Sequence, residues 1–306
     1  MLEATVKKIL QARVYEAACE TPISPAPFLS RRFNNQILIK REDLQPVFSF
    51  KIRGAYNKMA QLTQDQKDKG VIAASAGNHA QGLAMAAKLM GVKAVIVMPR
   101  ITPDIKVQAV RARGAKVILK GDAFAAAAEH AQELIKEHGY TYIPPFDDID
   151  VVAGQGTIGV EILRQHAGRL DAIFVPVGGG GLIAGIAAYV KYLRPDIKVI
   201  GVEAEDSACL KAALEAGERV VLEQVGVFAE GVAVAQIGEV PFSLIKDLID
   251  GVITVNTDEM CAAVKDIFED TRAVAETSGA LSLAGLKKYV QQTGAEGETL
   301  LCINSG

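Results

Sequence analysis

The stretch PVFSFKIRGAY, residues 46–56, places a lysine where helix electrostatics disfavour one. Pro46 interrupts the preceding structure, Ser49 is suited to N-cap a helix, and helix-forming residues follow. Lys51 then falls in the first helical turn, where the positive end of the helix dipole disfavours a cation. Phe50 adds an apolar ring beside it. We therefore predict that this lysine functions as an uncharged amine, able to act as a nucleophile or a base.

A second stretch with chemical potential is the turn VPVGGGGLIAG. Its four consecutive glycines let the backbone approach an anion, and their N–H groups open the next helix: Gly178, Gly179, Gly180 and Gly181. A tight turn alone does not need four glycines, so a phosphate site is the favoured interpretation. The same turn, with Ala184, also fits the dinucleotide pattern G-x-G-x-x-G/A, and Glu203 ends the following strand. A nicotinamide-nucleotide-binding protein is therefore a competing interpretation.

The turn SAGNHAQG, residues 75–82, gathers a hydroxyl, an amide, an imidazole and two glycines at the start of a helix. The free N–H groups of a helix start suit a carboxylate, and the side chains of Ser75 and Asn78 would assist. The residues expected around such a substrate carboxylate are Ser75, Ala76, Gly77, Asn78 and His79. The alternative is simple capping by Ser75 or Asn78, with His79 solvated in the first turn, but capping explains only one such residue.

The chain ends in TLLCINSG, an apolar strand that carries Ser305 at its terminus. A neutral lysine, a phosphate site, a carboxylate site and a strand-end hydroxyl have one joint explanation, which is pyridoxal 5′-phosphate (PLP). This cofactor has an aldehyde for the lysine, a phosphate for the glycines and a ring nitrogen for the hydroxyl, while an amino-acid substrate brings the carboxylate. We expect Arg53 and the aromatic rings to help the helix dipole lower the pKa of Lys51.

The elements that must position these residues repeat one theme of apolar strand, glycine-containing turn, helix and apolar strand. Strands are expected in VIAAS, KAVIVMP, AKVILKG, YTYIPP, AIFVPV and KVIGVEAE. Because these segments are apolar throughout rather than alternating, both faces of each strand should be buried under helices, which indicates parallel sheets. We predict a doubly wound α/β protein whose ligands bind beyond the carboxyl ends of the strands. The polar turn PPFDDID, residues 144–150, is the expected crossing between two lobes.

Composition excludes several other classes of protein. The chain has 306 residues, half of them hydrophobic, and a net charge of −3 without a basic block, so no nucleic-acid or membrane partner is expected. The N-terminus has no signal-peptide pattern, and no apolar run approaches the ~20 residues of a bilayer span. A cytoplasmic homo-oligomer with a small-molecule substrate and no metal site is expected. The cysteines are widely spaced, as in reduced proteins, and three histidines should lie at the surface: Cys19, Cys209, Cys261 and Cys302, and His130, His138 and His166.

Five stretches together resemble the threonine/serine dehydratases of the fold type II (tryptophan synthase β-like) PLP enzymes: SFKIRGA, SAGNHAQG, AGQGTIG, VPVGGGGLIAG and SGALSLAG. The stretches VEAEDSACLKAAL and FAEGVAV are similar to the biosynthetic threonine dehydratases of that family. The likeness covers nearly the whole chain. It implies conversion of L-threonine into 2-oxobutanoate and ammonia, the first step of isoleucine biosynthesis, with a lesser activity on L-serine. A serine dehydratase or racemase of the same family uses almost the same residues and is an alternative.

The resemblance also implies a role for each matching residue. Lys51 should form the Schiff base with PLP, and Phe50 should pack on the cofactor ring. Asn78 should hydrogen-bond the 3′-oxygen of the pyridine ring, and Ser305 should face the ring nitrogen. The four glycines should hold the phosphate. In the related serine racemases a serine occupies the position of Ala76, so a chain with alanine there should eliminate water without inverting its substrate.

The family's organisation gives expectations for the domains. The smaller lobe should comprise residues 53–147, and the larger lobe residues 1–52 together with 148–306. Biosynthetic members continue beyond SGAN into a C-terminal regulatory domain, whereas this sequence stops at SG, so no such domain is expected in it. Some relatives bind a divalent cation through acidic residues that follow the strand ending here at Glu203. Ser207 and Cys209 stand in that segment, so we do not expect a full divalent site.

Overall fold

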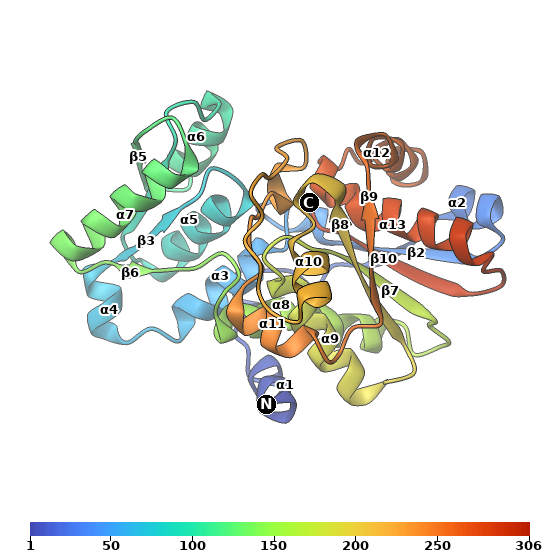
Figure 1. Ribbon diagram of the computed structural model, residues 1–306. Coiled ribbons are helices and arrows are strands. Elements are labelled where there is room, and N and C mark those ends of the chain that lie inside the picture. The colour runs from blue at the N-terminus through green and yellow to red at the C-terminus, as the bar shows by residue number, and fades with distance from the viewer.

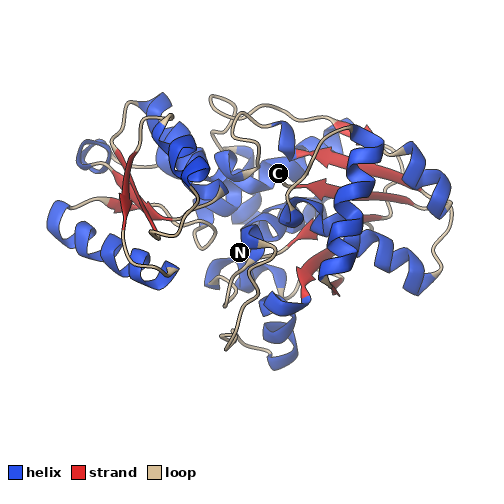
Figure 2. Ribbon diagram, turned by 90° about the horizontal axis from the view of Figure 1, so that it is seen from above, coloured by secondary structure: helices blue, strands red, loops and turns tan.

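The computed structural model describes residues 1–306 and contains two β-sheets, which lie side by side (Figures 1 and 2). The larger sheet has the strand order β1-β2-β10-β7-β8-β9, and the smaller has the order β5-β4-β3-β6. The larger sheet consists of β1 (Ile23–Pro25), β2 (Gln36–Arg41), β10 (Thr299–Asn304), β7 (Ala172–Pro176), β8 (Lys198–Ala204) and β9 (Gly251–Val255). The smaller sheet consists of β5 (Lys116–Leu119), β4 (Ala94–Met98), β3 (Val71–Ala74) and β6 (Thr141–Tyr142).

The strand pairing confirms the predicted parallel α/β fold. Every pair of neighbouring strands is parallel except β1 with β2. β3, β4, β7 and β10 are buried along their whole length, as their uninterrupted apolar sequences predict. β10 lies between β2 and β7, with Leu301 in register with Leu38 on one side and Ile173 on the other. The strand that carries Ser305 is therefore central in the larger sheet.

Helices cover both faces of each sheet, as a doubly wound fold requires. The larger sheet packs against α8 to α11 on one face and against α2, α12 and α13 on the other. The smaller sheet packs against α3, α5 and α6 on one face and against α7 on the other. The helices are α1 (Leu2–Leu10), α2 (Pro27–Phe33), α3 (Lys51–Ala60), α4 (Gln64–Lys69), α5 (Asn78–Met90), α6 (Asp104–Arg111), α7 (Phe124–His138), α8 (Ile149–Gln165), α9 (Gly181–Leu193), α10 (Cys209–Ala216), α11 (Glu239–Ile245), α12 (Thr257–Thr271) and α13 (Thr277–Thr293). None of them is both long and apolar enough to cross a membrane.

Three short 3₁₀ segments complete the list of secondary-structure elements. They are η1 (Glu42–Leu44), η2 (Glu205–Ser207) and η3 (Glu230–Val232). The turn between β6 and α8 carries the chain from the smaller sheet to the larger one, where the sequence predicted a crossing. All strands of the smaller sheet fall within residues 71–142, inside the expected smaller lobe, and the exact lobe boundaries stay a prediction. In both views the C-terminus lies between the two sheets.

The start of α3 corrects one detail of the sequence analysis. Lys51 is the first residue of α3, so its predicted place in the first turn is confirmed. The N-cap, however, is Phe50, which makes no side-chain capping bond, and the prediction of Ser49 as the cap is wrong. The hydroxyl of Ser49 is buried and has no hydrogen-bond partner. Capping preference is a weak local force, and here the packing of this segment against the chain end decided where the helix begins.

α3 lies between the two sheets and touches helices from both sides at glycines. A Cβ added at Gly82 of α5 would lie 3.0 Å from the carbonyl carbon of Lys51. A Cβ added at Gly154 of α8 would lie 2.7 Å from the carbonyl oxygen of Arg53. Both neighbours are backbone atoms, which cannot move aside as a flexible side chain can. The absence of a side chain at these glycines therefore sets how closely α3 is held.

We predict that Gly154→Ala destabilises the protein by about 1–3 kcal/mol, because the added methyl overpacks the contact between α8 and α3. The apparent Tm from circular dichroism should fall accordingly. Gly251→Ala at the start of β9 is the matched control, because an added Cβ there meets nothing within 4 Å. A Tm for Gly154→Ala equal to that of the control would contradict the close packing described here.

Candidate active site

The amine of Lys51 lies at the junction of the two sheets. Its Nζ donates a hydrogen bond to the carbonyl oxygen of Pro145 at 3.1 Å and lies 5.1 Å from the centre of the Phe50 ring. Burial lowers the pKa of Lys51 to about 8, and the negative charge of Glu276 opposes this shift. At pH 8 about half of these amines are neutral, against less than about 1% for a lysine with its ordinary pKa. The predicted depression of the lysine pKa is therefore present in the structure.

Arg53 does not contribute to that depression, contrary to the expectation from sequence. Its guanidinium forms ion pairs with the carboxylates of Glu42 and Glu161. Burial lowers the pKa of Lys51, and the negative charge of Glu276 is the one influence that opposes it. Two paired carboxylates compensate the positive charge of Arg53, so little of its field reaches the lysine.

The end of β10 comes directly against the start of α3. The backbone N–H of Phe50 donates to the carbonyl oxygen of Ser305 at 3.3 Å. The hydroxyl of Ser305 is buried and lies 3.4 Å from the carbonyl oxygen of Ser278, to which it donates. The chain end and the lysine, separated by about 250 residues of sequence, therefore form one continuous site wall.

Glu276 is a site residue that sequence reasoning missed. Its Oε1 accepts hydrogen bonds from Asn78 Nδ2 and from Ser278 Oγ, both at 2.7 Å, and its N–H donates to the carbonyl of Gly306 at 3.2 Å. It also influences the pKa of Lys51. The available signal was its place as the N-cap residue of α13, immediately before the stretch SGALSLAG. This carboxylate joins the Asn78 turn to the chain end.

The glycine turn, residues 178–181, has the properties of a phosphate site. Gly179 and Gly180 are buried, and the N–H groups of Gly178, Gly179 and Gly180 donate no hydrogen bond within the protein. α9 begins at Gly181, so the positive end of its dipole lies at this turn. Unpaired buried N–H groups are rare in proteins unless a ligand satisfies them. The turn therefore fits an anionic group such as a phosphate.

The backbone conformation and the close packing of the glycine turn require glycine at two of its positions. Gly180 has a φ of +88°, which favours glycine, and a Cβ at Gly179 would lie 2.1 Å from Cγ of Phe146. Phe146 follows Pro145, whose carbonyl accepts the hydrogen bond from Lys51. The segment of Pro145 and Phe146 thus connects the lysine to the glycine turn, which the sequence did not reveal.

The turn at residues 75–79 opens α5 toward the same region. The N–H of Gly77 donates to Oγ of Ser75 at 3.3 Å, and Ala76 lies in the bend between them. The first N–H groups of α5 have no intrahelical partner and are available to a carboxylate. Asn78, the first residue of α5, directs its amide to Glu276.

His79 is buried, so the alternative of a solvated side chain is wrong. Its Nε2 lies 2.8 Å from the carbonyl oxygen of Ile143. Burial, followed by the charge of Lys51, lowers the pKa of His79 to about 4. The imidazole is therefore neutral near pH 7, with Nε2 donating to the carbonyl. His79 contributes backbone and packing to this turn rather than a positive charge.

Glu203 has a structural role that the dinucleotide interpretation did not anticipate. Its fully buried carboxylate accepts hydrogen bonds from the N–H groups of Leu210 at 2.7 Å and Lys211 at 2.9 Å. It therefore caps the first turn of α10. Burial raises the pKa of Glu203 to about 7. Because both oxygens face a helix start, this carboxylate is not free to bind a ribose.

The cysteines and the remaining histidines lie as expected. All four cysteines are free, and Cys19 and Cys261 are exposed while the other two are buried. Burial raises the pKa values of Cys209 and Cys302 to about 12, so both are unreactive thiols. His130, His138 and His166 lie at the surface.

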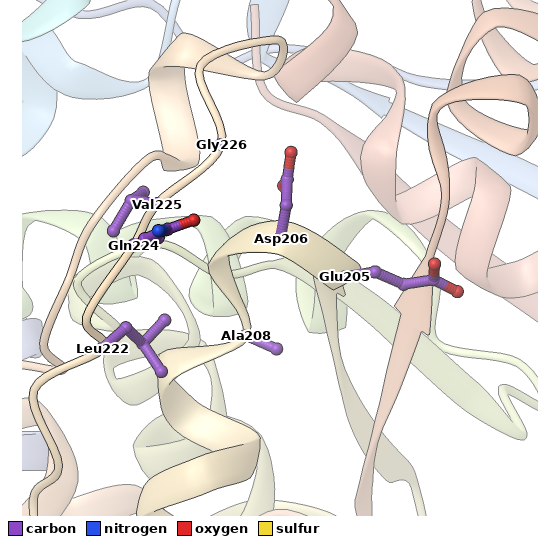
Figure 3. A pocket seen from close by; sticks show the side chains of 7 residues that line it. All are labelled: Glu205, Asp206, Ala208, Leu222, Gln224, Val225 and Gly226. Atoms are coloured by element: carbon purple, nitrogen blue, oxygen red, sulfur yellow. The ribbon is translucent and has the colours of Figure 1, made fainter.

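A cavity lies apart from the lysine, between η2 and the loop that precedes η3 (Figure 3). It measures about 400 Å³ and is lined by Glu205, Asp206, Ala208, Leu222, Gln224, Val225 and Gly226. Figure 3 shows the carboxylates of Glu205 and Asp206 pointing in different directions. They do not converge on a common point, and the cavity includes none of the predicted site residues.

The fold and the site together define an α/β enzyme class with a buried lysine of lowered pKa and a glycine turn suited to an anion. Residues 14–306 match the family model for pyridoxal-phosphate dependent enzymes. The biosynthetic L-threonine dehydratase IlvA of Burkholderia multivorans is 58% identical over 304 residues, which are 98% of this chain and 60% of that protein. The chain belongs to the pyridoxal-phosphate dependent enzyme family and has the fold type II architecture that the sequence predicted.

Solved structures agree with this assignment. The processed form of threonine deaminase isoform 2 from Solanum lycopersicum matches with a TM-score of 0.98 and 48% identity, over 100% of this chain and 89% of that chain. Maize serine racemase matches with a TM-score of 0.93 and 31% identity, over 99% of this chain and 92% of that chain. The chain spans about 60% of the length of the curated bacterial dehydratases that it matches.

We predict that Glu276→Gln lowers the pKa of Lys51 below about 8, because the carboxylate stabilises the protonated amine and the amide does not. The measurement is the pH dependence of Lys51 acetylation in cofactor-free protein, followed by mass spectrometry. Glu215→Gln on α10 is a control that should leave the profile unchanged. An unchanged or higher Lys51 pKa in Glu276→Gln would show that Glu276 does not act on the lysine.

Proposed function

We propose that this chain catalyses the PLP-dependent dehydration and deamination of L-threonine to 2-oxobutanoate and ammonia, with a lesser activity on L-serine. The observation that carries the proposal is the Lys51 amine, with a pKa of about 8, between an anion-binding glycine turn and a helix start suited to a carboxylate. The names of the curated dehydratases and of the tomato threonine deaminase support threonine as the substrate. By that reaction the chain would take the first step of isoleucine biosynthesis.

The residues on the site wall would hold the cofactor in five places. Lys51 would bond to its aldehyde carbon, and the glycine turn would bind its phosphate. Phe50 would pack on the ring, Asn78 would donate to the 3′-oxygen and Ser305 would face the ring nitrogen. When bound, PLP supplies an electron sink for the pair left on Cα after proton removal. A hydroxyl at Ser305 is neutral, so it cannot hold the ring nitrogen protonated as a carboxylate would.

Lys51 would then serve as the base that removes the Cα proton. A general base works best when its pKa lies near the working pH, and burial brings this amine to about 8. The carbonyl of Pro145 orients the amine through the 3.1 Å hydrogen bond. The neighbouring His79 stays neutral and donates to Ile143, so it does not compete for the proton.

The turn at residues 75–79 would bind the substrate carboxylate. Ser75 and Gly77 immediately precede α5, whose first N–H groups lack intrahelical partners, and the dipole of α5 favours an anion there. Ser75, Ala76, Gly77, Asn78 and His79 would supply this site, with His79 acting through its backbone. A carboxylate fixed there would direct the substrate's Cα toward Lys51.

We expect Lys51→Ala to reduce threonine turnover by at least about 10⁴-fold, because it removes the base together with the group that bonds to the cofactor. Lys51→Arg should fail equally, since guanidinium stays protonated in proteins. Formation of 2-oxobutanoate, coupled to its reduction by NADH, measures the rate, and kcat/KM for serine is measured in parallel. Lys69→Ala on α4 is the surface control. Full activity of purified Lys51→Ala would refute the proposal, and a higher kcat/KM for serine would correct the substrate.

The similarity to maize serine racemase makes inversion of serine the alternative activity. Inversion needs a proton carrier on the face of Cα opposite Lys51, and the methyl group of Ala76 can neither give nor take a proton. We expect the unmodified protein to form pyruvate from L-serine without D-serine, and Ala76→Ser to form detectable D-serine. Chiral chromatography measures both. D-serine produced by the unmodified protein as fast as pyruvate would favour the racemase.

Two further parts of the proposal concern the setting of the enzyme. We propose a cytoplasmic location, which four free cysteines support. We also propose a homo-oligomer. The two lobes, residues 53–147 and residues 1–52 with 148–306, are proposed as the units that meet at the site.

A further inference from the structure

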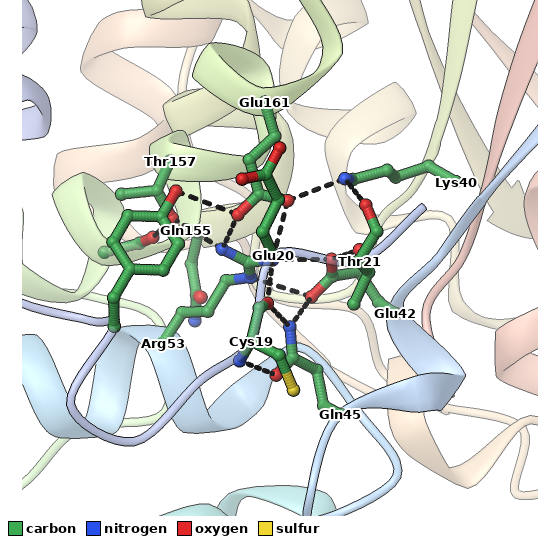
Figure 4. A network of polar contacts seen from close by, with 12 residues as sticks. Cys19, Glu20, Thr21, Lys40, Glu42, Gln45, Arg53, Gln155, Thr157 and Glu161 are labelled. Carbon is green, nitrogen blue, oxygen red and sulfur yellow. Dashed lines mark hydrogen bonds and ion pairs between the residues drawn. The ribbon is translucent and has the colours of Figure 1, made fainter. Parts of the chain in front are cut away.

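A buried network of charges lies beside the site and takes no part in the chemistry described so far (Figure 4). It consists of two cations and two carboxylates whose side chains are fully inaccessible to solvent: Lys40, Arg53, Glu42 and Glu161. They come from β2, α3, η1 and α8. We call this set the Arg53 network. The charges of its four members sum to zero.

Arg53 is the centre of the network and uses every donor of its guanidinium. Nε and Nη2 donate to the two oxygens of Glu42, both at 2.8 Å. Nη1 and Nη2 donate to the two oxygens of Glu161, at 2.6 and 3.0 Å. The remaining bonds go to Thr157 Oγ1 at 3.1 Å and to the carbonyl of Cys19 at 3.2 Å. Only the planar fork of an arginine can bind two carboxylates in this paired manner.

The other members are equally well satisfied. Nζ of Lys40 donates to Glu161, to Gln165 and to the carbonyl of Thr21. Glu42 also accepts from Thr21 Oγ1 and from Gln45, and Glu161 also accepts from the hydroxyl of Tyr15. A buried ion pair is strongly destabilised when one partner is lost, because the remaining charge stays buried. The elements that supply the network are therefore fixed relative to one another.

This fixed point lies two residues from the lysine, within the same helical turn. Arg53 and Lys51 are both in the first turn of α3, and the N–H of Arg53 donates to the carbonyl of Phe50 at 3.0 Å. On the following residue, the N–H of Gly54 donates to Gln155 of α8 at 3.1 Å. The first turn of α3 is thus tied to α8 through both a side chain and the backbone. Tilting or sliding this turn would break the bonds of Arg53 to two carboxylates together.

We propose that Arg53 is a positioning residue, which holds the first turn of α3 so that the amine of Lys51 stays directed toward Pro145 and the glycine turn. What Lys51 does there rests on the proposed function. The charge of Arg53 is compensated within the network, so its effect on Lys51 is geometric. A lysine at position 53 would keep the charge but would lose the paired bonds to the two carboxylates.

Two variants separate the effect of the geometry of Arg53 from the effect of its charge. Arg53→Lys keeps the charge and removes the fork. The double substitution Arg53→Met with Glu42→Gln removes one positive and one negative charge, so the network stays neutral without the fork. Arg41→Met is the matched control, because Arg41 makes a similar paired contact with Asp43 beside the network and forms no hydrogen bond or ion pair with α3.

The first readout uses cofactor-free protein and does not depend on activity. The pH dependence of Lys51 acetylation is measured by mass spectrometry in variants that circular dichroism shows to be folded. In both Arg53 variants the amine should escape from its buried position, and its labelling pKa should rise by about one unit toward the ordinary value of lysine. The control should retain the profile of the unmodified protein.

The second readout is steady-state kinetics with threonine in the holoenzyme. Misplacing the amine affects the chemical step more than substrate binding, so kcat should fall by at least about 10-fold while KM changes by less than about 3-fold. Thr157→Val, which removes one hydrogen bond from Arg53, should shift both readouts in the same direction but less. If the Arg53 variants do not fold, the result for Thr157→Val tests the positioning role of Arg53.

Folded Arg53 variants with an unchanged Lys51 labelling profile and an unchanged kcat would overturn the positioning role. The same holds for an unchanged profile in Thr157→Val if it is the only variant that folds. The two readouts also distinguish a failure of the positioning role from a failure of the proposed function. If the unmodified protein does not convert threonine but the labelling profile still shifts in the variants, the proposed function fails and the positioning role of Arg53 stands.

Discussion

The paired binding of two carboxylates to the buried guanidinium of Arg53 is the interaction on which the arrangement around α3 depends. A charge that is removed from water must be matched by partners of opposite charge, so Arg53 can be buried only where Glu42 and Glu161 meet it. That requirement brings η1 and α3 together with α8, whose Glu161 is 108 residues from Arg53 in the sequence. Glycines at the helix contacts then allow α3 to approach its neighbours closely enough for these bonds to form.

The same burial has opposite consequences for two cations that are two residues apart. Burial lowers the pKa of Lys51 to about 8, since its charge has little compensation beyond Glu276. Burial would also lower the pKa of Arg53, but the carboxylates of Glu42 and Glu161 raise it above its usual value. One side chain is therefore held permanently charged and serves as a fixed anchor, while the other becomes an amine that can lose its proton near neutral pH.

The sequence was most informative where local rules decide the outcome. Apolar strands, the glycine turn and the position of Lys51 at a helix start follow from backbone geometry and patterning, and the structure contains them. The sequence analysis was wrong or gave no prediction where the role of a residue depends on a partner from another segment of the chain. Glu203 caps a helix instead of standing free, Arg53 is compensated instead of acting on the lysine, and Glu276 enters the site through contacts with Asn78 and the chain end.

By itself, the sequence determined the α/β class, the lysine placed against the helix dipole, and the glycines that an anion requires. These properties are local, because they depend on residue type, strand and helix periodicity and backbone freedom over a few neighbouring positions. Only the tertiary structure decided which charges are compensated, how far burial shifts the pKa of Lys51, and that Ser305 ends a central strand beside Phe50. Those properties depend on the dielectric surroundings and on contacts across about 250 residues, and local sequence patterns do not specify either.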